Sequence, residues 1–353
     1  MKIAIDTSPL NDQNLISHRV RGVGFYVKHL KDALLKYYPD NEYIFFTRGE
    51  RLDSSTDLIH YPYFDPFFLT LPFFEKTKRV VTVHDLTPQV FPEHFPAGLK
   101  GNFKWQIQKI NLLKSERVLT DSKASKKDIE KHAGYDKNKI DVIYLAASKE
   151  FGQLANGSWL AAIRQKYKLP AKFVLYVGDI TWNKNIPRLI KASIKINIPL
   201  ILVGAALANK NYDKNNPWNQ DLVECIGLIE KSKRVRVLGF VPTEDLVAIY
   251  NLANVFVMPS LYEGFGLPIL EAMQSGCPVV TSKEGSLPEV AGENAYYVDA
   301  QSIDSIAVGI NEVFESTKLQ NEFSKKGLDQ AKKFSWQKTA EKTIEAYEKI
   351  LNT

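Results

Sequence analysis

Short apolar runs alternate with amphipathic segments along the whole chain, and this alternation predicts an α/β protein with parallel sheets. Apolar runs typical of buried strands occupy residues 2–6, 42–47, 57–61, 79–83, 117–122 and 139–145 in the first part of the chain. A second series follows at residues 172–178, 199–204, 235–240, 255–258 and 277–281. Segments such as Phe25–Lys36 place apolar residues three or four positions apart, which is the spacing of an amphipathic helix.

The restart of the β–α alternation indicates two domains, which the length of 353 residues also favours. We expect a Rossmann-like domain over residues 1–168 and a second one over residues 169–334, with a linker around Leu169–Ala171. Residues 335–353 then form a terminal helix, whose first turn is capped by the Ser335 hydroxyl.

The region that follows residue 254 combines a buried strand, a glycine-containing loop and a short helix. Gly264 and Gly266 let the backbone approach a ligand closely, and amides at a helix N-terminus bind phosphate. Glu263 and Glu271 frame the helix start, where their carboxylates can accept hydrogen bonds from sugar hydroxyls. The alternative is that Glu263 caps the helix and Glu271 is solvated, because glutamate is common near helix starts.

The segment Glu263–Met273, preceded by Pro259-Ser260, closely resembles the E-x7-E signature of retaining glycosyltransferases of family 4. The resemblance extends in order over nearly the whole chain and implies the GT-B fold, in which two Rossmann-like domains face each other across a cleft. It implies that Glu263 contacts the donor sugar, that Glu271 holds the nucleotide ribose, and that the terminal helix crosses back onto the first domain. The resemblance also implies donor-binding backbone groups at Val241, Gly264, Phe265, Gly266 and Leu267.

A His84-Asp85 pair follows the predicted strand at residues 79–83, and α/β sheets place ligands at the carboxyl ends of their strands. The alternative is structural, with His84 hydrogen-bonded and Asp85 capping the next segment. The segment of residues 83–96 resembles a mannosyltransferase-B-like branch of the family, which implies that His84 lies beside the donor sugar. GDP-mannose is the donor that this branch resemblance favours, while UDP- and dTDP-sugars remain open.

Gly22, Val23 and Gly24 lie between the first predicted strand and helix, and they predict a glycine-rich turn that could cradle phosphate. Such turns also serve simple close packing. The segment of residues 21–30 resembles the corresponding turn of the family, which implies that it closes over the donor phosphates. Its distance from the first strand argues against the dinucleotide fingerprint of a dehydrogenase.

The loop of residues 178–185 offers Asn183 and Lys184 as donor contacts, because a compact cation beside a helix N-terminus suits a diphosphate. A solvated loop lysine is the alternative. Many members of the family have an arginine directly after this glycine, whereas this chain has Asp179, an acid that would repel a diphosphate. Either Asp179 turns away, or Lys184 acts alone or with Arg19 or Arg21.

The net charge of +6 is concentrated between residues 97 and 140, where eleven basic residues face five acidic ones. A solvated helix face explains this excess, and so does a surface that docks on anionic lipid. Nucleic acid is disfavoured because no stacking aromatic residues are interleaved with these lysines. The aromatic residues of segment 61–74 lack a clean period, so they either pack internally or form an exposed apolar loop that holds an acceptor or touches a membrane.

The totals indicate a globular, cytoplasmic protein, with 44% hydrophobic and 24% charged residues. Cys225 and Cys277 lack metal-binding spacing and are typical of reduced core thiols. The strand pattern at the start predicts no signal peptide, and no apolar run approaches the length of a membrane span. Peripheral attachment to the inner face of the plasma membrane is the remaining membrane hypothesis.

Together these features predict a retaining glycosyltransferase that moves a hexose, with mannose as our choice, from a nucleotide diphosphate sugar to a hydroxyl of a glycan or lipid-linked acceptor. Surface polysaccharide synthesis is the expected context. We assign catalytic roles to Glu263, His84 and Lys184 and expect no cofactor and no metal. The alternatives are a sugar-nucleotide epimerase or hydrolase of the same fold, or a catalytically silent nucleotide-sugar-binding subunit. Sugar, base, acceptor and oligomeric state stay open.

Overall fold

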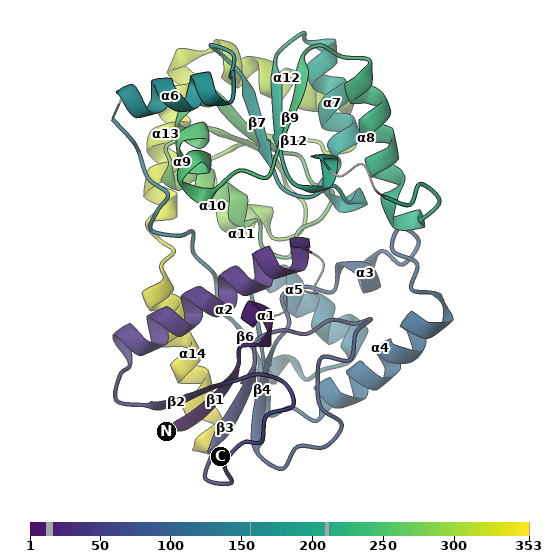
Figure 1. The fold of residues 1–353 in the computed structure, drawn as a ribbon, viewed down its shortest axis with the longest axis vertical. Coiled ribbons are helices and arrows are strands. Elements are labelled where there is room, and N and C mark those ends of the chain that lie inside the picture. Colours follow the sequence, from purple (N-terminus) through teal and green to yellow (C-terminus); the bar gives the residue numbers. More distant parts are fainter. Residues whose placement is uncertain (12–16, 156, 209–211, 353) are drawn as a thin grey trace. The chain divides into compact units, whose positions relative to one another are not determined.

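The computed structural model describes residues 1–11, 17–155, 157–208 and 212–352, and its backbone divides into two compact units (Figure 1). Unit 1 comprises Met1–Leu145 together with Ser335–Thr353, and unit 2 comprises Ala146–Phe334. Each unit is a parallel α/β domain, which confirms the predicted fold class of two Rossmann-like domains.

Unit 1 contains, within its described residues, a six-stranded parallel sheet in the order β2-β1-β3-β4-β5-β6. Its strands are β1 (Lys2–Asp6), β2 (Glu42–Phe46), β3 (Leu58–Tyr61), β4 (Lys78–Thr82), β5 (Arg117–Thr120) and β6 (Ile140–Val142). Its helices are α1 (Ser8–Asn11), α2 (Ser17–Tyr37), α3 (Thr87–Val90), α4 (Gly98–Leu113), α5 (Lys123–Asp128) and α14 (Trp336–Leu351), with short turns at Ile129–Ala133 and Lys137–Lys139. The Ser122 hydroxyl caps α5 by accepting the Ser125 amide.

Unit 2 contains a second sheet, six-stranded over its described residues and also parallel, in the order β12-β11-β10-β7-β8-β9. Its strands are β7 (Val174–Val177), β8 (Leu200–Val203), β9 (Val235–Gly239), β10 (Val255–Met258), β11 (Val279–Ser282) and β12 (Tyr296–Val298). Its helices are α6 (Ser158–Lys166), α7 (Ile186–Lys195), α8 (Gln220–Glu230), α9 (Thr243–Leu252), α10 (Leu267–Gln274), α11 (Leu287–Ala291), α12 (Ile303–Glu315) and α13 (Thr317–Ala331), with single turns at Trp182–Lys184, Ala206–Ala208 and Pro217–Asn219. Strand β12 lies at the sheet edge, and the sequence prediction missed it.

The inner strands read as continuous apolar runs because both faces of each sheet are covered. All four residues of β10 are buried. In unit 2, one core packs the β7, β8 and β10 side chains against the apolar faces of α7, α8 and α12. In unit 1, the corresponding core joins Ile59, Val81 and Val118 to Trp105 and Leu112 of α4.

Residues 146–168 belong to unit 2, whereas the sequence prediction assigned them to the first domain. The Asn251 side chain holds this segment by accepting the Leu154 amide and donating to the Gly152 carbonyl. The Gln274 amide group likewise donates to the carbonyls of Ser148 and Phe151. These bonds connect positions about a hundred residues apart, so local sequence could not reveal them.

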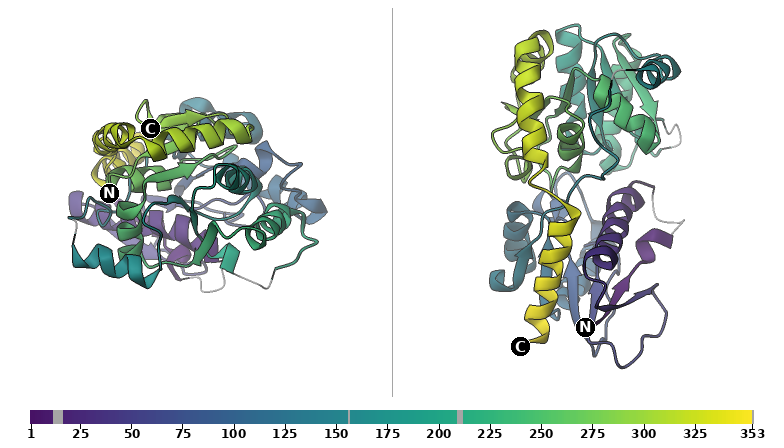
Figure 2. Two further views of the ribbon diagram at one scale, coloured as in Figure 1. Left: turned by 90° about the horizontal axis from the view of Figure 1, so that it is seen from above. Right: turned by 90° about the vertical axis from the view of Figure 1, so that its left-hand side faces the viewer.

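The terminal helix α14 packs in unit 1, alongside α2 (Figure 2). Its Ser335 hydroxyl accepts the Lys338 amide as the predicted N-cap. The Trp336 ring stacks on His29 with centroids 5.1 Å apart, and the Tyr347 hydroxyl lies 2.7 Å from His60 Nδ1. Among the described residues, no helix combines the length and apolar character needed to span a bilayer.

Candidate active site

The sheet order of unit 2 reverses between β7 and β10, which are neighbours although they are the first and fourth strands of this unit. Open α/β sheets bind ligands outside the carboxyl ends of their strands at such a reversal. The loops that follow β7 and β10 carry Lys184 and Glu263, so the fold brings these two predicted residues together at that point.

Glu263 is buried, and its carboxylate is held by two side chains. Lys184 Nζ donates to both carboxylate oxygens, at 2.8 and 2.7 Å, and the Ser260 hydroxyl donates to Oε1 at 2.7 Å. A buried carboxylate requires such partners, because removing one leaves an uncompensated charge worth about 3–5 kcal/mol. The predicted diphosphate cation is therefore paired with the predicted sugar-binding carboxylate, 79 residues away in the chain.

The backbone around Glu263 is fixed by the loop that follows β11. The Ser286 hydroxyl donates to the carbonyls of Glu263 and Phe265, at 3.0 and 2.7 Å. Gly285 has φ +58°, and a Cβ there would lie 2.6 Å from the Glu263 carbonyl oxygen and 2.9 Å from its amide nitrogen. Only glycine permits this approach, so the second loop positions the first.

Helix α10 begins directly after the glycine-containing loop, as predicted. Gly266 precedes it with φ +98°, and a Cβ there would lie 2.8 Å from Leu287 Cδ2. Pro268 occupies the first turn, where its missing N–H leaves no bond unmade. The segment Gly264–Leu267 thus lies at the positive end of the α10 dipole, which favours an anion.

Glu271 lies in α10 on the side of Tyr250, whose hydroxyl donates to Oε2 at 3.0 Å. Burial raises the pKa of Glu271 to about 7, although the hydrogen bond from Tyr250 opposes this shift. Glu271 is only partly exposed and is hydrogen-bonded to Tyr250, so it is not the freely solvated carboxylate of the alternative. A carboxylate desolvated in this way gains from any further hydroxyl donor, which is what a ribose offers.

Asn183 shapes the loop after β7. Its Nδ2 donates to the Tyr262 carbonyl at 3.0 Å, while its Oδ1 accepts the Thr181 hydroxyl at 2.7 Å. The Asp179 carbonyl oxygen accepts the Tyr176 hydroxyl at 2.8 Å, and no described residue forms a hydrogen bond or ion pair with the Asp179 carboxylate. Val241, the predicted backbone contact to the base, is buried just beyond β9.

The remaining predicted site residues belong to unit 1. His84 follows β4, and its Nδ1 lies 2.7 Å from Asp121 Oδ2 at the end of the neighbouring strand β5. Burial by itself would lower the pKa of His84, but the Asp121 carboxylate, together with Asp85 and the Pro62 carbonyl, outweighs this effect and the pKa is raised. The imidazole and the Tyr26 ring meet edge to face with centroids 4.8 Å apart. Asp85 caps the following turn by accepting the Thr87 amide at 2.8 Å.

The predicted glycine-rich turn at Gly22–Gly24 is wrong, because these residues lie inside α2. Glycine costs about 0.5–1 kcal/mol in a helix, which tertiary packing can offset. Here the residues that follow, Tyr26, Val27 and Leu30, are buried against unit 1 and provide that packing. A Cβ at Gly22 would meet open space. The prediction that Arg19 or Arg21 assists Lys184 concerns side chains that lie outside the described part of the structure.

Sequence reasoning missed four partner residues of the site, namely Ser260, Ser286, Tyr250 and Asp121. Ser286 and Tyr250 were hidden because their contacts join segments 23 and 21 residues apart, whereas Ser260 lies only three residues before its partner Glu263. Asp121 carried a signal, since it follows the strand next to that of His84 in a parallel sheet, where both strand ends meet at one edge. In the chain as described, no group of three or more His, Cys, Asp or Glu side chains could hold a metal ion.

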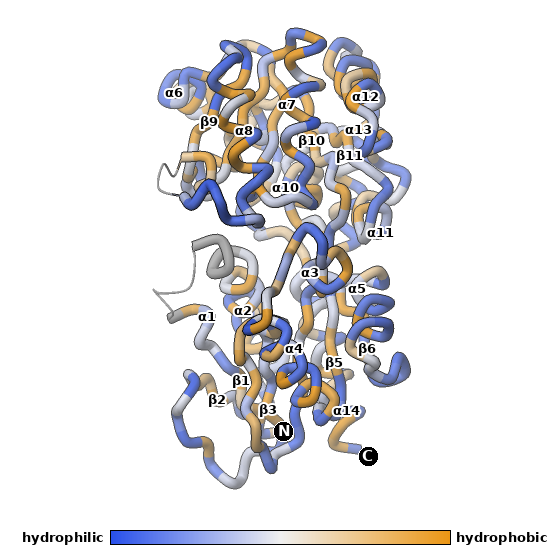
Figure 3. The backbone as a smooth tube through the Cα atoms, turned by 90° about the vertical axis from the view of Figure 1, so that its right-hand side faces the viewer, coloured by the Kyte–Doolittle hydropathy of each residue, from blue (hydrophilic) through white to orange (hydrophobic). Residues whose placement is uncertain are grey.

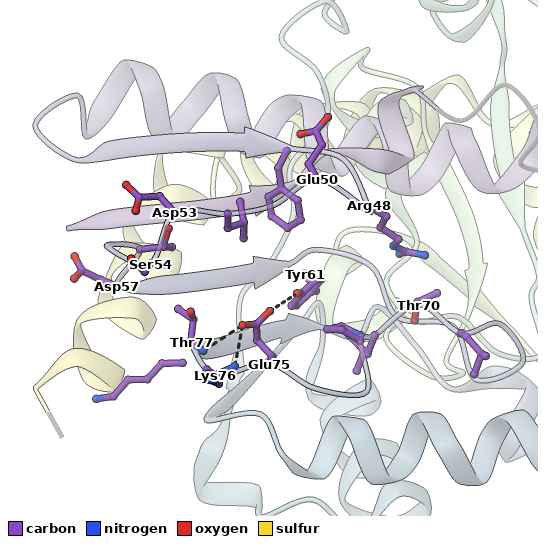
Figure 4. A pocket seen from close by; sticks show the side chains of 18 of the residues that line it. Arg48, Glu50, Asp53, Ser54, Asp57, Tyr61, Thr70, Glu75, Lys76 and Thr77 are labelled. Atoms are coloured by element: carbon purple, nitrogen blue, oxygen red, sulfur yellow. Dashed lines mark hydrogen bonds between the residues drawn. The ribbon is translucent and has the colours of Figure 1, made fainter.

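Unit 1 also contains a pocket of about 940 Å³ that the sequence did not predict (Figure 4). The loop after β2, including Arg48 and Glu50, forms one wall, and the segment of residues 69–78 forms another. The Tyr61 hydroxyl donates to Glu75 Oε2 at 3.3 Å within it. None of the predicted site residues lines this pocket.

Comparisons with known proteins agree with this architecture. The family model described as Glycosyl transferases group 1 matches residues 161–330, and that of Glycosyltransferase Family 4 matches residues 15–150. The chain is 33% identical over 282 residues to O-antigen chain mannosyltransferase B of Escherichia coli, a match that covers 76% of this chain and 70% of that protein.

Two solved structures are similar over the full chain. Sucrose-phosphate synthase from Thermosynechococcus elongatus has a TM-score of 0.76 at 20% identity, covering 100% of this chain and 99% of that one. HepE of Anabaena, solved in complex with UDP-glucose, has a TM-score of 0.73 at 20% identity, covering 99% of this chain and 100% of that one. At such identities these likenesses show the fold.

Proposed function

The chain belongs to glycosyltransferase family 4 and is a glycosyltransferase of the GT-B fold, and from this premise we propose that it transfers mannose from GDP-mannose to a hydroxyl of a glycan or lipid-linked acceptor. We further propose that the anomeric configuration of the sugar is retained. Surface polysaccharide synthesis is the proposed context, supported by the similarity to an O-antigen mannosyltransferase.

The observation that carries this proposal is the buried Glu263, held by Lys184 and Ser260 beside the start of α10. In the proposed complex, the diphosphate lies against the positive end of α10, where negative charge develops as the bond to the sugar breaks. Lys184 then shares its ammonium group between Glu263 and the diphosphate. Glu263 orients the sugar through its hydroxyls, which is a contribution of positioning.

Glu271 is proposed to hold the ribose, and the raised pKa of its carboxyl supports this role because two hydroxyl donors would stabilise the charged form. In unit 1, His84 is proposed to lie beside the donor sugar, with Asp121 holding its Nδ1. No cofactor or metal enters the proposed reaction. Loss of the diphosphate leaving group depends instead on the α10 dipole and Lys184.

The nucleotide base is the least constrained part of the proposal. The mannosyltransferase relative supports GDP-mannose, whereas the structural neighbour from Anabaena is complexed with UDP-glucose. Asp179 adds a negative charge to the loop after β7, where many family members have an arginine, and it weakens the expected diphosphate affinity. Partial attachment to an anionic membrane through the basic residues of segment 97–140 also belongs to this proposal.

The test begins with calorimetric binding of GDP, UDP, dTDP and ADP, followed by turnover of the matching mannose or glucose donor. We expect GDP to bind most tightly, and Glu263→Gln to abolish transfer because the variant keeps the shape of the side chain but loses its charge. Glu315→Gln, an exposed position of α12 in the same unit, is the matched control. NMR of the product tests retention.

Donor consumption without an acceptor would identify an epimerase or hydrolase instead. Nucleotide binding without turnover of any donor would favour a silent binding subunit. Full transfer activity in Glu263→Gln would contradict the proposed site itself.

A further inference from the structure

Helix α4 presents an apolar face to solvent. Leu99, Phe103, Ile110 and Leu113 have exposed fractions of 92%, 68%, 55% and 46%. At about 100° per residue, their positions fall within an arc of roughly 80°, so they form one stripe along the helix. In Figure 1 the helix lies at the outer edge of unit 1.

The opposite face of α4 packs on unit 1 through the apolar side chains of Trp105 and Leu112, and it also carries buried polar residues. Gln108 is fully buried, and its Nε2 donates to the Thr70 hydroxyl at 2.5 Å and to the Asp65 carbonyl at 3.3 Å. The carbonyl of the buried Asn111 accepts a hydrogen bond from the Arg79 guanidinium. Helix α4 therefore has apolar residues on both faces, whereas a surface helix normally confines them to the face that meets the core. Figure 3 shows hydrophobic and hydrophilic residues alternating along α4.

The segment of residues 68–74, which precedes α4 in the sequence, extends this apolar surface. Its exposed side chains are Phe68, Leu69, Phe73 and Phe74, with exposed fractions of 42%, 45%, 50% and 93%. Lys104 Nζ of α4 lies 5.2 Å from the centroid of the Phe68 ring. At the other end of α4, Phe73 and Phe74 line a depression whose charged side chains are of both signs, namely Lys76, Arg79 and Lys114 beside Glu75 and Glu116. We call this set of eight exposed residues and α4 the apolar docking surface.

The charge of this surface distinguishes between a second copy of the chain and a membrane as its partner. Helix α4 carries Lys100, Lys104 and Lys109, and its sequence contains no acidic residue. A two-fold contact with a second copy would bring together two patches of the same positive charge, because such an interface uses the same surface on both chains. An anionic bilayer satisfies both properties, since it buries aromatic and aliphatic side chains at the acyl boundary while its headgroups attract the flanking lysines.

We propose that the apolar docking surface inserts into the interface of an anionic phospholipid bilayer. The inference rests on the proposed function, which already includes a membrane partner. There the lysines of segment 97–140 alone contact the membrane, whereas here apolar side chains insert into it. Several of those basic groups are already engaged, since Arg117 pairs with Asp141 and Lys126 Nζ donates to the Ile140 carbonyl. Inserted residues therefore carry the binding, and Lys100 and Lys104 select the anionic headgroup, since Lys109 Nζ already donates to the His132 carbonyl at 3.2 Å.

The experiment is co-sedimentation of the full chain with vesicles of phosphatidylcholine, with and without phosphatidylglycerol, at low and high salt. We expect binding to the anionic vesicles that weakens but persists at high salt. Leu99→Ser with Phe103→Ser should weaken it by about tenfold or more, given the apolar area that each side chain buries. Ile110→Ser should weaken binding, whereas Val308→Ser should not, although Val308 on α12 is 53% exposed and thus a matched control.

Lys100→Gln with Lys104→Gln should reduce binding at low salt and leave the high-salt fraction unchanged. If high salt abolishes vesicle binding and the serine variants bind as well as the natural chain, insertion is overturned. Loss of self-association in the serine variants, measured by ultracentrifugation, would assign the surface to a second copy and also overturn it. Vesicle binding needs no donor and nucleotide binding needs no vesicle, so failure of this inference and failure of the proposed function are distinguishable.

Discussion

Replacing Glu271 by glutamine should stabilise the unliganded protein while it removes nucleotide binding. The Glu271 carboxyl lies against the Tyr250 hydroxyl, and burial raises its pKa from 4.5 to about 7. A shift of this size corresponds to about 3 kcal/mol of unfavourable interaction for the charged form. Glutamine keeps the shape and still accepts the Tyr250 hydrogen bond, but it has no charge to bury.

The pH dependence follows from the direction of the shift. A carboxyl with a raised pKa in the folded state contributes stability that is fully present below the unfolded value of 4.5 and is lost as the pH rises through about 7. Over that window the advantage of Glu271→Gln over the natural chain should grow by about 1.4 kcal/mol per pH unit. Above about pH 7 the difference should level off.

The assay is urea unfolding of both proteins at about pH 5 and about pH 8 without nucleotide, so that other titrating groups cancel in the difference. Calorimetry of the preferred nucleotide then shows whether the variant has lost the ribose contact. Tyr250→Phe is an informative second variant, because it removes the hydrogen bond that lowers the pKa of Glu271 and should move the pH dependence upward.

An equal stability difference at both pH values would refute the argument that Glu271 is desolvated. Unchanged nucleotide affinity in a variant that shows the expected stability gain would leave the burial argument intact and refute the ribose contact.

Three further predictions concern the loops around the site. Gly285→Ala should weaken donor binding, because the new Cβ would displace the Glu263 backbone. An unaltered nucleotide affinity by calorimetry, or an unmoved Glu263 backbone in a crystal structure of the variant, would contradict this. Asp121→Asn should lower the pKa of His84, since burial remains while the compensating charge is lost, and an unchanged imidazole titration by NMR would argue against the pair. Asp179→Asn should tighten nucleotide diphosphate binding by a few-fold at low salt, with the gain fading as salt screens the charge; an equal affinity would indicate that the carboxylate points away from the phosphates.

The sequence by itself determined the class of each domain and most of its strands. Parallel strands buried on both faces require runs such as Val255–Met258, and a helix start after Gly266 follows from the glycine and the proline beside it. The E-x7-E segment likewise located the two carboxylates of the candidate site. These features depend on residues that are neighbours in the chain, so local pattern is sufficient to find them.

Only the tertiary structure decided which groups those carboxylates meet. Lys184 and Glu263 form an ion pair because β7 and β10 are adjacent, and Ser286 reaches the same loop from β11. The glycines at Gly22–Gly24 were read as a turn, since helix propensity is a local average that packing overrides. The exposed apolar stripe of α4 could not be identified from periodicity, because the helix has apolar residues on both faces and only the packed fold determines which of them meet solvent.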